Sequence, residues 1–153
     1  MTKIFFTLLL TLTIVKAADA QSSKRVQVSN TEDNVAIGGY DPVAYFRQGK
    51  AVEGRKEFAV NADGIIYYCS SAANRDVLSK NYAIYEPQYG GWCAYAMGKT
   101  GEKVEVDPET FKIVDGKLFL FYNFYFNNTL TDWNANEASL KKNADANWKK
   151  ISN

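Results

Sequence analysis

The stretch FAVNADGIIYYCSSAANRDVL, residues 58–78, decides the fold class of this chain. Its first half holds two runs with the composition of β-strands, 58–60 and 65–69. Between them stand Asp63 and Gly64, and Asp-Gly is a strong signal for the tight turn of a β-hairpin. The sequence therefore predicts an antiparallel pair of strands at this point.

Helices are expected on both sides of this hairpin. One of the two serines that follow it caps a helix over 72–78. Before the hairpin, Asp41 is a good N-cap and Pro42 suits the first position of a short helix, which Gly49 ends.

The rest of the chain continues with elements of the same kinds. The fold class that they predict is an α+β domain, with a small antiparallel sheet built from hairpins and several helices packed against it. We expect strands at 104–106, 111–114 and 117–121, a buried helical turn within 88–97, and helices at 122–133 and 136–151.

The first twenty residues have the layout of a cleaved signal peptide. Lys3 supplies a positive start, an apolar run follows over 4–15, and Ala18 and Ala20 are small residues at the positions that a signal peptidase reads. The apolar run is shorter than the roughly 20 residues that span a bilayer, which disfavours an uncleaved anchor. The sequence predicts cleavage after residues 1–20 and a periplasmic or secreted protein.

The remaining chain is expected to be one domain. Residues 21–33 are polar and are interpreted as a flexible lead-in, and 34–151 as a single folded domain. Removing the predicted leader leaves equal numbers of acidic and basic residues, so charge gives no reason to expect nucleic acid as a partner. No later segment is apolar enough to predict a membrane span.

The whole sequence lacks histidine. That composition excludes Ser-His-Asp triads, Cys-His pairs and zinc sites with His ligands. Catalysis would then need a reactive cysteine or a pair of carboxylates, and no spacing of acidic residues forces such a pair together. We therefore expect a protein that is not an enzyme.

Several ordered motifs give the chain a family resemblance. Together they resemble the secreted YHS domain-containing proteins of bacteria, over nearly the whole predicted domain. The motifs are GGYDPVAYF (38–46), SSAANRD (70–76), YEPQYGGWCAYA (85–96), KIVDGKLFL (112–120) and ADANW (144–148).

This resemblance implies a YHS-like fold and a link to metal handling. The wider YHS family is similar to modules attached to copper-transporting ATPases, whose cysteines are thought to hold the metal. That pattern has a cysteine directly after Asp-Pro-Val, where this chain has Ala44. The cysteines of this chain are instead Cys69, at the end of the predicted hairpin, and Cys93 in a later motif.

Three interpretations of the two cysteines stay open. In an exported chain Cys69 and Cys93 would most simply form a disulfide. They would otherwise be buried free thiols that act as small apolar residues. In the third interpretation two thiolates bind a soft ion such as copper(I), and Met97, four residues after Cys93, adds a thioether. Cys69, Cys93 and Met97 are thus the candidate metal ligands.

An aromatic cluster supports a different class of function. It consists of Tyr82, Tyr85, Tyr89, Trp92 and Tyr95. These side chains are either part of the core or the wall of an apolar pocket with hydroxyl groups at its rim. The second hypothesis is therefore a small-ligand or protein-interaction module, with a structural disulfide and an aromatic surface.

Overall fold

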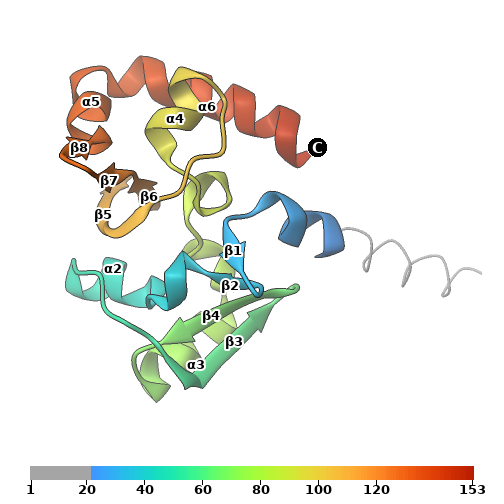
Figure 1. Cartoon of the computed structure of the whole chain (residues 1–153). Coiled ribbons are helices and arrows are strands. Elements are labelled where there is room, and N and C mark those ends of the chain that lie inside the picture. Colours follow the sequence, from blue (N-terminus) through green and yellow to red (C-terminus); the bar gives the residue numbers. More distant parts are fainter. Residues whose placement is uncertain (1–21) are drawn as a thin grey trace, which may run out of the picture.

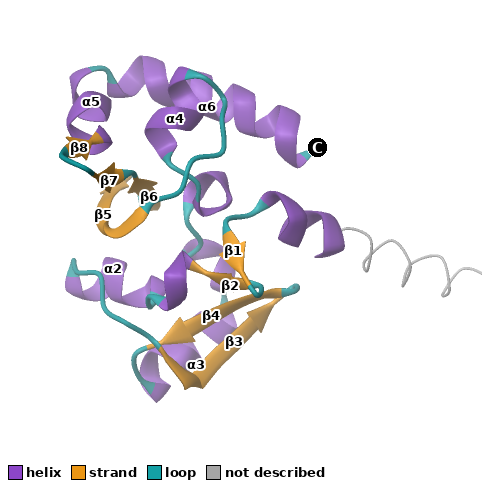
Figure 2. Cartoon of the chain, in the orientation of Figure 1, coloured by secondary structure: helices purple, strands orange, loops and turns teal. Residues whose placement is uncertain are grey.

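The computed structural model describes residues 22–153, and the protein has an α+β fold (Figure 1, Figure 2). The predicted signal peptide lies outside the described residues. The strands are β1 (Thr31–Glu32), β2 (Val35–Ala36), β3 (Arg55–Ala62), β4 (Ile65–Cys69), β5 (Asp107–Val114), β6 (Lys117–Phe121), β7 (Asn123–Phe124) and β8 (Asn127–Asn128). The main sheet has the order β1-β2-β4-β3, and β5-β6 and β7-β8 form two further pairs.

Helices cover both the main sheet and the β5-β6 pair (Figure 2). One helix spans 22–28 at the start of the described chain. The others are α2 (Pro42–Gln48), α3 (Ala72–Lys80), α4 (Ala94–Lys99), α5 (Thr129–Ala135) and α6 (Glu137–Ser152), with short 3-10 turns η1 (Ile37–Gly39), η2 (Tyr82–Ile84) and η3 (Gln88–Gly91). Within the described residues no helix is both long enough and apolar enough to cross a bilayer.

The predicted hairpin is confirmed as β3 and β4. Asp63 and Gly64 both have positive φ, 49° and 91°, which is the geometry of the turn that Asp-Gly favours. Most of the main sheet is antiparallel, as predicted, but β2 pairs with β4 in parallel through Val35 and Ile66. The sheet is therefore mixed at β2.

The helix after Asp41 is also confirmed, and its cap has a second role. One carboxylate oxygen of Asp41 accepts hydrogen bonds from the Val43 and Ala44 amides, at 2.9 and 3.3 Å. The other accepts from the Ser70 amide and hydroxyl and from Asn74 Nδ2, at 2.7, 2.6 and 2.7 Å. This fully buried carboxylate therefore joins α2 to the end of β4 and to α3.

Two core clusters share strand β6. Side chains alternate across a strand, so Leu118 and Leu120 face one cluster while Phe119 and Phe121 face the other. The first core cluster is Ala36, Ile37, Val43, Tyr45, Ala62, Ile65, Tyr67, Cys69, Leu78, Leu118 and Leu120. The second core cluster is Tyr89, Ala94, Met97, Phe119, Phe121, Trp133 and Ala144.

Two predicted elements differ from the structure. Residues 104–106 are not a strand, and β5 begins at Asp107 instead, since Pro108 is tolerated at the start of an edge strand. The predicted helix over 122–133 is wrong in its first half, where β7 and β8 form a hairpin. The helix starts at Thr129 because the Asn128 side chain caps it, accepting from the Leu130 amide at 3.0 Å.

The predicted lead-in also has a definite structure in its described part. Residues 22–28 are helical, and the chain after them is fixed to the segment around η3. Trp92 Nε1 donates to the Val28 carbonyl at 2.7 Å, and the Asn30 amide donates to the Gly90 carbonyl at 2.8 Å. The polar composition predicted a loose segment. The partners that order it lie about sixty residues away in sequence, so the local sequence did not reveal them.

Candidate ligand-binding pocket

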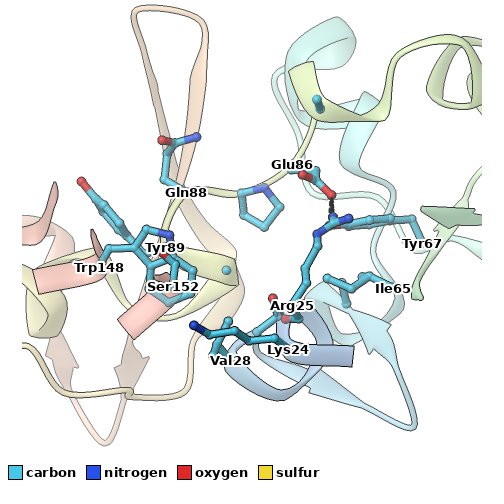
Figure 3. A pocket seen from close by; sticks show the side chains of 15 residues that line it. Lys24, Arg25, Val28, Ile65, Tyr67, Glu86, Gln88, Tyr89, Trp148 and Ser152 are labelled. Carbon is cyan, nitrogen blue, oxygen red and sulfur yellow. Dashed lines mark hydrogen bonds and ion pairs between the residues drawn. The ribbon is translucent and has the colours of Figure 1, made fainter. Parts of the chain in front are cut away.

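A pocket of about 360 Å³ lies between the two core clusters (Figure 3). Its walls come from the 22–28 helix, the main sheet, the end of α6 and the connecting segment, residues 83–91. The residues that line it are Lys24, Arg25, Val28, Ser29, Ala36, Ile65, Tyr67, Ala83, Glu86, Pro87, Gln88, Tyr89, Gly90, Trp148 and Ser152.

One side of the pocket is aromatic. Figure 3 shows Trp148, from α6, next to Tyr89 of the connecting segment. The Tyr89 hydroxyl donates to Asp145 Oδ1 at 2.9 Å, and burial together with this carboxylate raises the pKa of Tyr89. The two aromatic groups are thus held by α6, and they present an apolar surface to the pocket.

The opposite side carries a network of charged and hydroxyl groups. Arg25 pairs with Glu86, and the Tyr67 hydroxyl donates to the same Glu86 oxygen, Oε1, at 3.1 Å (Figure 3). A second Arg25 nitrogen donates to the Ala62 carbonyl at 3.0 Å. Burial raises the pKa of Tyr67 to about 12, although Arg25 opposes the shift. The phenol therefore stays protonated and acts as a donor near neutral pH.

Charge and size together indicate what the pocket fits. Two of its lining residues, Lys24 and Arg25, are cationic, and one, Glu86, is anionic. Arg25 pairs with Glu86 and lies 3.9 Å from Asp63, whereas exposed Lys24 donates to the main-chain oxygen of Asn153. The volume of about 360 Å³ falls at the lower end of the roughly 300–1,000 Å³ that ligand pockets span. The arrangement suits a small molecule with an apolar body and one anionic or hydrogen-bond-accepting end.

The backbone of the connecting segment keeps the pocket narrow. Tyr89 and Gly90 both have positive φ, 56° and 60°. A Cβ atom on Gly90 would lie 2.7 Å from Trp148 Cη2 and 3.1 Å from the Ser29 Cα. Glycine is therefore required here, because the connecting segment passes directly between α6 and the chain after the N-terminal helix.

The two predicted metal-binding cysteines are buried and do not form a disulfide. Cys69 ends β4 inside the first core cluster. Cys93 is equally enclosed, and its Sγ accepts from the Tyr122 amide at 3.4 Å and lies 3.5 Å from Thr129 Oγ1. The sulfurs occupy the places of small core residues.

The disulfide and metal-site predictions are therefore wrong. Both thiols are free, and Met97, the third predicted ligand, is buried in the second core cluster while Cys69 is buried in the first. Across residues 22–153 no group of three or more His, Cys, Asp or Glu side chains is placed to hold a metal ion. The copper interpretation fails because the predicted ligands are buried among core side chains, with Cys69 and Met97 in different core clusters, and buried free thiols remain from the three interpretations.

The predicted aromatic cluster is divided between the two cores. Tyr82 and Tyr85 pack against the first core cluster, whereas Tyr89, Trp92 and Tyr95 belong to the second. Tyr89 is the member that lines the pocket.

Sequence reasoning missed most of the pocket. It did not single out Arg25, Tyr67, Glu86 or Trp148 as site residues, although the last two stand within motifs of the family resemblance. Their wide separation along the chain hides their proximity, and no pattern of residue types in the sequence marks them as neighbours.

Comparison with family models, with curated proteins and with solved structures finds no match to this chain. The resemblance to YHS domains therefore depends on the sequence motifs alone.

Proposed function

We propose that this chain is a YHS-like binding module that holds a small amphipathic anion in the pocket between its two core clusters. One observation carries the proposal: the pocket places an aromatic side, Trp148 and Tyr89, opposite the Arg25–Glu86–Tyr67 network. An apolar body would pack on the aromatic side, and a carboxylate would pair with the exposed ammonium of Lys24 in place of its contact with Asn153.

Binding without catalysis fits the chemistry of the groups nearby. The two thiols are buried in the cores and are not among the residues that line the pocket. The raised pKa of Tyr67, about 12, keeps its phenol from acting as a base near neutral pH. Glu86 is already engaged by both Arg25 and Tyr67. The proposed role is therefore recognition of the ligand.

The proposal is tested by NMR titration of the isotope-labelled protein. The probes are small carboxylates with an aromatic or branched body, each paired with its neutral amide. We expect shifts at the Trp148 indole N–H and at the amides of 24–29 and 86–90, with about tenfold weaker binding of each amide probe.

Two variants sharpen the test. Lys24→Ala removes an exposed cation together with its contact to the main-chain oxygen of Asn153. It is expected to remove most of the preference for carboxylates, with an effect on the fold limited to the end of the chain. Tyr95→Phe is the matched control, since Tyr95 lies outside the pocket lining and its hydroxyl contacts exposed Lys99. The proposal is wrong if the NMR shift changes occur at residues away from the pocket. It is also wrong if carboxylate and amide probes bind the unaltered protein equally.

A further inference from the structure

The hairpin β7-β8 presents aromatic side chains to solvent. Tyr125 is 91% exposed, Phe126 is fully exposed, and Phe124 is 42% exposed. Of the large apolar side chains that are exposed in the described chain, Ile84 is the one that lies elsewhere. The three residues Phe124–Phe126 are called the aromatic tip, and they lie on the outside of the half of the molecule built from β5, β6 and α5 (Figure 1).

The backbone of the aromatic tip is strained. Tyr125 and Phe126 have φ of 52° and 63°, and a two-residue turn with positive φ at both positions normally takes Asn and Gly. Aromatic residues are disfavoured in this left-handed region because their Cβ approaches the backbone. An unfavourable conformation that also exposes apolar surface indicates a role outside folding.

The base of the hairpin is fixed to the fold, so the tip projects in one direction. Asn123 Nδ2 donates to Thr110 Oγ1 of β5 at 2.9 Å, and the Thr129 amide donates to the Tyr122 carbonyl at 3.0 Å. The Tyr122 ring packs edge-on against Phe124, with centroids 5.1 Å apart.

The segment that forms the tip and its flanks carries no charged residue. The sequence from 118 to 131 contains no Asp, Glu, Lys or Arg, in a chain in which these make up 23% of residues. The flanking polar residues are Asn and Thr, which lose far less free energy than ions when they leave water. The tip and its flanks are therefore suited to a neutral, partly apolar environment.

Size decides which environment fits. Each aromatic side chain buries about 150–250 Å² when covered, and Phe124 is already more than half covered. The total is below the roughly 800 Å² per partner of a stable protein–protein interface. A bilayer interface needs no complementary shape, and aromatic side chains are enriched there.

We propose that the aromatic tip inserts into the interface of a zwitterionic lipid bilayer and attaches the domain to it peripherally. Insertion places the rings of Tyr125 and Phe126 at the level of the lipid headgroups, with the uncharged Asn residues at the surface. The attachment is reversible and independent of anionic lipid, and it does not depend on the function proposed for the pocket.

Flotation with phosphatidylcholine vesicles tests this proposal. The protein is expected to float with these vesicles, and equally with vesicles that also contain phosphatidylserine. Binding should change little with added salt, because charge at the tip is absent. Failure to float with phosphatidylcholine, or binding that requires phosphatidylserine and low salt, would overturn the proposal.

The decisive variant is Tyr125→Asn with Phe126→Gly. This pair suits the turn better than the natural residues, so the variant folds at least as well. The partition coefficient is expected to fall about tenfold or more, because two apolar side chains are lost. Ile84→Ser, which removes an exposed apolar side chain outside the hairpin, should leave it unchanged. Undiminished flotation of the Asn-Gly variant would contradict the assignment to the tip.

Discussion

The Cys69 side chain is fully enclosed at the end of β4. Burial, with a smaller contribution from the Asp41 carboxylate, raises the pKa of this thiol from 9.0 to about 12. The thiol is neutral near physiological pH, and a neutral buried thiol is a poor nucleophile and a poor metal ligand. The raised pKa of Cys69 and its complete burial therefore both indicate a structural role for this residue.

A pH dependence follows from this shift. The unfolded thiol ionises above its ordinary pKa of 9.0 while the folded thiol stays neutral, so ionisation favours the unfolded state. The free energy of unfolding is expected to be constant with respect to Cys69 below pH 9 and to fall as pH rises towards 12. In Cys69→Ala the decline between about pH 9 and 10.5 should be shallower, although Tyr45, Tyr67 and Tyr89, whose pKa values burial also raises, still contribute in the same direction. Urea denaturation at several pH values measures this dependence of the free energy of unfolding on pH.

Alkylation with iodoacetamide provides the control. Both thiols should resist labelling in the native protein at pH 8 and label fully in urea without reductant, as read by mass spectrometry. Equal pH slopes in the two proteins, or rapid native labelling of Cys69, would show that the burial argument is wrong.

At the scale of the element, Asp41 couples α2, β4 and α3. Asp41→Ala would remove the cap of α2 and leave the Ser70 amide and Asn74 amide group without their buried acceptor. We expect the free energy of unfolding to fall by about 3 kcal/mol or more, because hydrogen bonds to a buried charge are lost together. Equilibrium denaturation in urea is the measurement.

Ser71→Ala is the comparison for that variant. Ser71 caps α3 alone, accepting from the Asn74 amide at 3.2 Å, so its loss should cost about 1 kcal/mol. If the two variants are equally destabilised, Asp41 acts as an ordinary cap and the coupling of three elements is not supported.

Elements with short-range signals were predictable. The turn of β3-β4 is specified by Asp63-Gly64, and α2 by Asp41-Pro42 with Gly49 as its C-cap. The β7-β8 hairpin was not predicted, because its turn is formed by Tyr125 and Phe126 and aromatic residues are not typical of turns. Local chemistry thus specified an element only where its turn or cap used the usual residue types.

At the scale of the whole molecule, Gly90 lies where three parts of the chain meet. In Gly90→Ala the new methyl group would contact Trp148 of α6 and Ser29 after the N-terminal helix. We expect a loss of about 2 kcal/mol in the free energy of unfolding, and altered NMR shifts around the pocket.

Gly116→Ala separates packing from backbone strain. Gly116 also has positive φ, 69°, but a Cβ there would have no atom within 4 Å. Gly116→Ala should lower the free energy of unfolding by about 1 kcal/mol and leave the NMR shifts around the pocket unchanged. Equal stability losses and an unperturbed pocket in both variants would mean that the contact with Trp148 does not hold the pocket in shape.

The sequence by itself determined the α+β class, the hairpin β3-β4 and the helix after Asp41, since each depends on residues within a few positions of one another. Tertiary structure alone decided the pocket and the state of the cysteines. Arg25, Glu86 and Trp148 line one pocket only because the 22–28 helix, the connecting segment and α6 lie around it in the folded chain. Each thiol is enclosed by residues that are distant in sequence, and such burial is a property of the packed chain that residue spacing does not encode.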